Sequence, residues 1–119
     1  MGQESVKAVS EDPELDLVAQ TDLGDNLSDT IKQSQAQVVV DFTTAAVVME
    51  NAAAIIESGA RPVIGTSGLL PEQVSQLQAL CEKNNNGGVI APNFAVGAVL
   101  MMKYAQDAAK YFPNVEVIE

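Results

Sequence analysis

Short, wholly apolar runs alternate with helix-like patterns along this chain, and that alternation constrains its fold more than any other feature. Val38, Val39 and Val40 form one run, and similar runs lie at 62–64 and 89–91. A strand that is apolar on both faces belongs in a parallel sheet covered by helices. Strands and helices in regular alternation also predict crossover connections between parallel strands. We therefore expect an α/β fold with three layers and a mostly parallel sheet.

The bounds of the expected elements follow from apolar periodicity and from residues that end helices or strands. Parallel strands are expected near residues 17–21, 38–41, 62–64, 89–91 and 115–118. Helical patterns cover residues 3–10, 25–34, 45–58 and 94–111, and a further helix opens at Pro71. Ser28 is the expected cap of the second helix, and Gly59 is the expected left-handed cap after the third.

Length and charge exclude several classes of protein. The chain has 119 residues, enough for one domain, and its formal charge is −10 from 16 acidic and 6 basic residues. Six scattered cations cannot form the basic surface that nucleic acid or anionic lipid requires. Neither a secretory signal pattern nor an apolar run long enough to span a bilayer is present. We expect a cytoplasmic protein, or a protein of the plastid stroma if the source is a plant.

The chain holds one cysteine, Cys81, and no histidine. A single cysteine excludes an intramolecular disulfide and a cysteine-based metal cluster, so we expect Cys81 to be a small buried residue. The missing histidine removes the commonest general acid–base and the commonest metal ligand. We therefore assign no metal site and no catalytic residue.

Small, hydroxylated and amide residues follow three of the expected strands, at segments 42–44, 65–68 and 91–94. Ligands of open parallel sheets bind beyond the carboxyl ends of the strands, near the point where strand order reverses, as in Rossmann-like folds. Glycine admits close backbone approach, and helix N-termini favour phosphate groups. Each segment taken alone is better explained by helix capping than by ligand binding. Three such segments at successive strand ends favour a nucleotide site.

Asp22 closes the first expected strand, and Gly2 lies 20 positions before it. In dinucleotide-binding folds an acidic residue about 20 positions past the glycine motif binds the ribose hydroxyls of the adenosine half. An aspartate at a strand end is also a common turn residue. Two interpretations of Asp22 therefore remain: it binds the ribose of a nucleotide, or it is a turn residue.

Three ordered motifs give the chain a family resemblance: Val-Val-Asp-Phe-Thr at 39–43, Val-Ile-Gly-Thr-Ser-Gly at 63–68 and Ile-Ala-Pro-Asn-Phe-Ala-Val-Gly at 90–97. They resemble the nucleotide-binding domain of 4-hydroxy-tetrahydrodipicolinate (dihydrodipicolinate) reductase, and the cyanobacterial and plant-type members in particular. The resemblance implies an oxidoreductase that transfers hydride from NADH or NADPH to a dihydrodipicolinate-type substrate, in lysine biosynthesis through diaminopimelate.

The resemblance also implies roles for individual residues. Segment 65–67 would line the nicotinamide-ribose side of the cofactor, and segment 91–94 would contact nicotinamide. Asp22 would match the ribose-binding acid, and because no arginine follows it, NAD is favoured over NADP. The residues expected to bind the cofactor are Asp22, Phe42, Thr43, Gly65, Thr66, Ser67, Ala91, Pro92, Asn93 and Phe94.

The chain departs from the family pattern at both ends. The family opens with a strand and a Gly-x-x-Gly-x-Met-Gly loop, and Met1 and Gly2 resemble the last two residues of that loop. Past the position of Glu119 the family continues into a His-His-x-x-Lys stretch and then a substrate and tetramerisation domain. We therefore expect residues 1–119 to form part of a dinucleotide-binding domain, inactive alone, with an NADH dissociation constant no tighter than about 0.1 mM.

Two other functions remain open at this point. One is a degenerate Rossmann-like module that binds nucleotide weakly and performs no chemistry. The other is a structural role, in which exposed strand edges of two copies pair and form a homo-oligomer.

Overall fold

The computed structural model describes residues 1–91, 93–112, 114 and 116 of the chain. In order along the sequence its elements are α1 (Gly2–Glu11), α2 (Leu27–Ser34), β1 (Val38–Asp41), α3 (Val48–Glu57), β2 (Arg61–Ile64), α4 (Pro71–Lys83), β3 (Val89–Ile90) and α5 (Val96–Ala108). Of the strand expected at 115–118, only Glu116 is described, so that expectation lies outside the described residues.

The three strands form one parallel sheet in the order β1-β2-β3. Val38 pairs with Arg61 at one end of the first pair and Asp41 with Ile64 at the other, and Ile64 pairs in turn with Ile90. The strand order does not reverse among the described strands, in contrast to the expected switch point. The parallel α/β class is confirmed, and all three carboxyl ends meet at one edge of the sheet.

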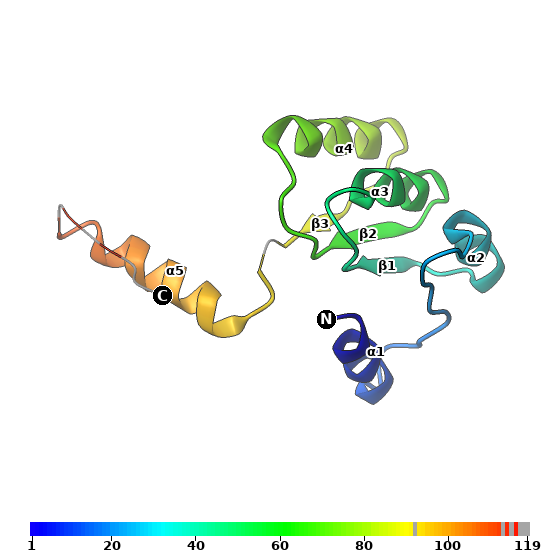
Figure 1. Cartoon of the computed structure of the whole chain (residues 1–119), viewed down its shortest axis with the longest axis horizontal. Helices are drawn as coiled ribbons and strands as arrows, with labels where there is room; N and C mark the ends of the chain where they lie inside the picture. Colours follow the sequence, from blue (N-terminus) through cyan, green and yellow to red (C-terminus); the bar gives the residue numbers. More distant parts are fainter. Residues whose placement is uncertain (92, 113, 115, 117–119) are drawn as a thin grey trace.

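The core lies on the face of the sheet that α3 and α4 cover (Figure 1). Val48, Ala52 and Ile56 of α3 pack with Ile64 of β2 and Leu77 of α4, and all five are buried. Helix α3 carries apolar residues over most of its circumference, so its other side packs elsewhere: Ile55 contacts Ile31 of α2 and Ala60. Complete burial of such a side chain contributes about 1.5–3 kcal/mol. Helix α3 is therefore the central helix of the fold.

Helix bounds agree with the expectation where local signals are strong. Pro71 opens α4, and Gly59 follows α3 with φ of 87°, the left-handed conformation that a glycine adopts without strain. The cap of α2 differs from the expected one: Asn26, not Ser28, is the N-cap, because the Asn26 side-chain oxygen accepts a hydrogen bond from the Asp29 backbone N–H at 3.1 Å. Cys81, expected to be a small buried residue, packs against the core but is only partly buried.

The third layer of the expected fold is not present among the described helices. Val38 and Val89 are 51% and 56% exposed, and α1 and α5 stand apart from the sheet (Figure 1). Helix α5 starts at Val96, two residues later than expected, and its apolar side chains are exposed beside its polar ones.

The strand expected at 17–21 was wrong. This segment is irregular and exposed, and Leu15 and Asp25, on either side of it, donate backbone hydrogen bonds only to the turn carbonyls of Asp12 and Asp22. An alternating apolar pattern becomes a strand only where a neighbouring strand offers a ladder of donors and acceptors. None of the described strands pairs with this segment.

None of the helices in the described part of the chain combines the length and the apolar character needed to cross a membrane.

Candidate functional site

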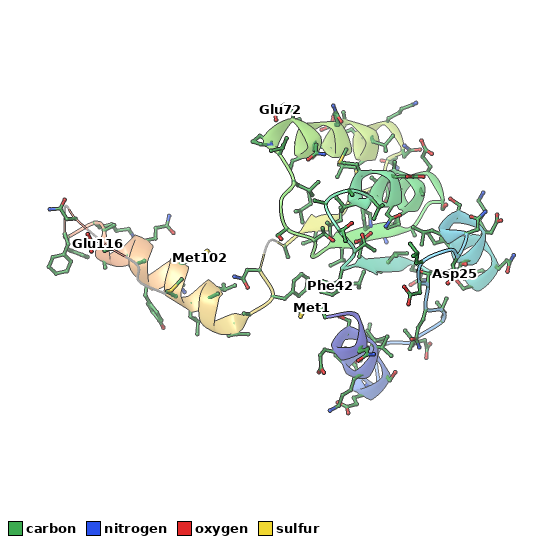
Figure 2. All side chains as sticks on the ribbon, viewed as in Figure 1. Met1, Asp25, Phe42, Glu72, Met102 and Glu116 are labelled. Atoms are coloured by element: carbon green, nitrogen blue, oxygen red, sulfur yellow. The ribbon has the colours of Figure 1, made fainter. Side chains whose placement is uncertain are left out.

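The three segments singled out in the sequence meet at the carboxyl edge of the sheet. The Gly65 N–H donates to the Asp41 carbonyl oxygen and the Ala91 N–H to the Ile64 carbonyl oxygen, both at 2.9 Å, so the ladder extends one residue beyond β2 and β3. These bonds hold the residues after β1, β2 and β3 side by side. Figure 2 places Phe42 at this edge, between the sheet and the chain that leads into α5.

The carboxyl group of Asp41, the last residue of β1, is buried at this edge, and Asp41 is 5% exposed. Its Oδ1 accepts hydrogen bonds from the Thr43 N–H at 2.8 Å, the Thr43 hydroxyl at 2.7 Å and the Thr66 hydroxyl at 3.1 Å. Its Oδ2 accepts one from the Asn51 side-chain amide at 2.9 Å. One side chain thus joins the segments after β1 and β2 to the first turn of α3.

Thr43 and Thr66 belong to the expected site, but their hydroxyl groups make hydrogen bonds within the protein. Both hydroxyl protons are donated to Asp41, and the Thr43 oxygen also accepts from Asn51 at 3.3 Å. Neither hydroxyl therefore has a proton left for a ligand. Ser67, the next residue along, is exposed at the edge.

Phe42 and Phe94 form an aromatic contact across the edge. Their ring centroids are 4.9 Å apart and the rings are inclined by 68°, an edge-to-face arrangement. The Phe42 ring lies directly on Gly65, where a Cβ atom would overlap the ring carbons. Gly65 is required here by close approach of the ring, and Gly68, at φ of 92°, by its backbone conformation.

The segment after β3 is shaped by Asn93, whose side-chain oxygen accepts a hydrogen bond from the Ala95 N–H at 2.9 Å. This turn delays the start of α5 and places Phe94 against Phe42. Ala91 is partly buried, whereas Pro92 lies outside the described residues.

Asp22 is not joined to this cluster by any contact of its side chain. Its carboxyl oxygen accepts from the Leu23 N–H at 2.7 Å, and the Asp25 carboxyl accepts from the Asp22 N–H at 2.8 Å, which makes a closed acidic turn. The adjoining residues 24–28 and α3 border an open hollow of about 420 Å³ beside Glu50 and Asn51. The hydrogen bond that the Asp22 side chain accepts is typical of a turn residue. Its role as a ribose ligand stays a prediction.

Two residues of this hydrogen-bond cluster, Asp41 at the end of β1 and Asn51 on α3, were not among the expected site residues. The signal for Asp41 was an acid at the end of an otherwise apolar strand, with a threonine two positions later. Asn51 carried no comparable signal, because its role arises from a contact with a residue ten positions away. Among the described residues no group of three or more acidic or cysteine side chains is placed to hold a metal ion.

Known proteins resemble the chain in both sequence and fold. A profile of the family described as "Dihydrodipicolinate reductase, N-terminus" matches residues 1–94, which include the three strands and nearly all of the carboxyl edge. The chain belongs to this family. Its place there agrees with the resemblance that the three motifs indicated.

Individual curated proteins that resemble the chain carry the name of the same family. A 4-hydroxy-tetrahydrodipicolinate reductase of Coxiella burnetii is 51% identical over all 119 residues, and one of Listeria monocytogenes is 45% identical over a 139-residue alignment. The chain covers 50% and 53% of these two proteins, so it spans about half the length of the curated relatives it matches.

A solved structure, "Dipicolinate bound Dihydrodipicolinate reductase from Paenisporosarcina sp. TG-14", superposes with a TM-score of 0.82 at 39% identity. The match covers 97% of this chain and 51% of that one. The fold similarity therefore extends over nearly the whole of the chain and again over half of the relative.

Proposed function

We propose that residues 1–119 are the nicotinamide-dinucleotide-binding part of a dihydrodipicolinate reductase. The reaction is hydride transfer from the cofactor to a dihydrodipicolinate-type substrate, in lysine biosynthesis through diaminopimelate. The observation that carries the proposal is the carboxyl edge of the sheet. There Asp41 binds the segments after β1 and β2 together, and the segment after β3 joins them through the Ala91–Ile64 backbone bond and the contact of Phe94 with Phe42. Family membership supports it, and so does the name of the dipicolinate-bound relative.

The residues of the edge fit a dinucleotide. Phe42 is partly buried and Phe94 is 41% exposed, so their rings offer apolar surface to a flat nicotinamide ring. Ser67 is exposed and offers its hydroxyl and backbone to the adjoining ribose, next to Gly65, which the Phe42 ring covers, and the buried Thr66. The bound cofactor would supply the hydride. The chain's own contribution is to bind and orient it, because Thr43 and Thr66 hold their segments in place through Asp41.

We further propose that NADH binds more tightly than NADPH. The acidic turn carries the carboxyl groups of Asp22 and Asp25, and both already accept backbone hydrogen bonds. The 2′-phosphate of NADPH would add negative charge beside them, whereas a free ribose hydroxyl can donate a hydrogen bond to a carboxylate. The residues directly after Asp22 in the sequence include no arginine that could neutralise a phosphate.

Titration of the 119-residue chain with NADH and NADPH, followed by cofactor fluorescence, tests the proposal. We expect saturable binding of both, weaker for NADPH, and further weakening by Phe94→Ala. A matched control is Tyr111→Ala, which removes an exposed aromatic ring at the far end of α5. Equal loss of binding in both variants, or no binding of either nucleotide, would contradict the proposal.

A further inference from the structure

Asp41 is a buried acidic side chain held by hydrogen bonds. The ion pairs of the described residues join Lys7 to Glu11 and Lys110 to Asp107, and none involves Asp41. Burial of a carboxyl group is costly unless hydrogen bonds replace its lost hydration. Here four donors do so, from a backbone N–H, two hydroxyls and one amide.

The donors come from segments that are distant in sequence. Thr43 lies two positions from Asp41, Asn51 ten and Thr66 twenty-five. Because the same carboxyl group binds all three, the segment after β1 cannot move relative to the segment after β2 without breaking one of these bonds. Phe42 lies between Asp41 and Thr43, and Gly65 precedes Thr66. The contact of the Phe42 ring with Gly65 is thus fixed from both sides.

We propose that Asp41 is a positioning residue of the dinucleotide site, acting through Thr43 and Thr66 rather than by touching the cofactor. This inference rests on the proposed function. The carboxyl group sets the spacing between the Phe42 ring and the backbone of Gly65 and Thr66, which are the groups that would contact the nicotinamide half. Asn51 completes the arrangement from α3.

The hydrogen-bond pattern of Asp41 permits a specific exchange. In Asp41→Asn the amide oxygen is only a neutral acceptor for the three bonds at Oδ1, and its NH₂ group meets the NH₂ group of Asn51. Asn51 must turn its amide over to accept from it and then loses its bond to Thr43, and no carboxylate remains in the cluster. Adding Asn51→Asp gives that NH₂ group a charged acceptor and restores the net charge. The double variant therefore recovers the hydrogen bonding of Asp41 with its carboxyl group moved to position 51.

The experiment compares the intact 119-residue chain with D41N, the double variant D41N/N51D and D16N, a matched control. Asp16 is exposed, so D16N makes the same change of charge away from the site. For each protein the NADH dissociation constant and the thermal midpoint are measured, the former well below the midpoint. We expect D41N to bind about tenfold more weakly, as loss of one hydrogen bond to a charged group predicts. D16N and the double variant should lie close to the parent.

Several outcomes overturn the inference. If folded D41N binds NADH as the parent does while its thermal midpoint falls, Asp41 is structural only. If D41N does not fold, the double variant decides: when it too fails to fold, or binds about tenfold more weakly than the parent, hydrogen-bond complementarity at Asp41 does not position the site.

A parent chain that binds no NADH contradicts the proposed function, and the inference is then judged without a ligand. Amide hydrogen exchange at Thr43, Gly65 and Thr66 should become faster in D41N and return to the parent rate in the double variant. Unchanged exchange in D41N would overturn the positioning role of Asp41 independently of cofactor binding.

Discussion

The Phe42 ring packs edge-to-face on the Phe94 ring at a centroid distance of 4.9 Å, and the same Phe42 ring covers Gly65. The two rings come from the segments after β1 and β3, which flank the central strand β2. Their contact therefore spans the end of β2 and completes the carboxyl edge. At Gly65 the Phe42 ring leaves no space for a larger side chain.

Gly65→Ala should destabilise the chain by about 1–3 kcal/mol, the usual cost of forcing extra volume into a packed contact. The added Cβ would overlap the Phe42 ring, which must swing away and lose its contact with Phe94. Gly87→Ala is the matched control, because a Cβ atom there meets nothing within 4 Å. Urea unfolding measures both changes, and equal stability of the two variants would contradict the close packing of Phe42 on Gly65.

Ile55→Ala should cost about 2–5 kcal/mol, since it leaves a cavity in a fully buried part of the core. Ile55 of α3 packs against α2, where it contacts Ile31. Val74→Ala, on the exposed side of α4, should cost far less because Val74 is 37% exposed. Thermal or urea unfolding distinguishes them, and a similar loss in both would argue against α3 as the central helix.

Asn26→Ala should destabilise α2 by about 0.5–2 kcal/mol, the usual cost of losing an N-cap. The Asn26 side chain accepts from the Asp29 N–H, whereas Ser28, the cap expected from the sequence, lies inside the helix. Ser28→Ala should therefore change the free energy of unfolding by less than about 0.5 kcal/mol. The reverse order of the two variants in urea unfolding would show that α2 begins two residues later.

The sequence predicted elements where local chemistry is decisive and failed where distant contacts decide. Pro71 and Gly59 act on their own backbones, so the start of α4 and the end of α3 were predicted correctly. A strand at 17–21 required a neighbour that no local pattern can reveal. The apolar surface of α5 likewise indicated burial, although the helix stands apart from the sheet.

The candidate site shows the same division. Its three segments were predicted because each follows an apolar strand and carries recognisable residues. Asp41 and Asn51 were missed because their bonds join residues up to twenty-five positions apart. The cofactor roles of the expected residues, the preference for NAD and the formation of a homo-oligomer stay predictions.

The 119-residue chain alone should not oxidise NADH in the presence of a dihydrodipicolinate-type substrate. It contains no histidine, and Lys110, in the exposed turn after α5, is held by Asp107 at 2.7 Å. A missing general acid lowers a rate by about 10²–10⁴-fold, and misplacement of the reactants lowers it further. Absorbance of NADH over time checks this. Steady oxidation that Asn93→Ala abolishes would show that the chain carries its own proton donor.

The central claim is that the segments after β1, β2 and β3 form the nicotinamide-dinucleotide site. NMR titration of the isotope-labelled chain with NADH tests it most directly, because every backbone amide reports separately. Saturable shifts are expected at Phe42, Gly65, Thr66 and Phe94, with little change at Gly87, which precedes the opposite end of β3. Absence of shifts at the carboxyl edge, or shifts confined to other parts of the chain, would contradict it.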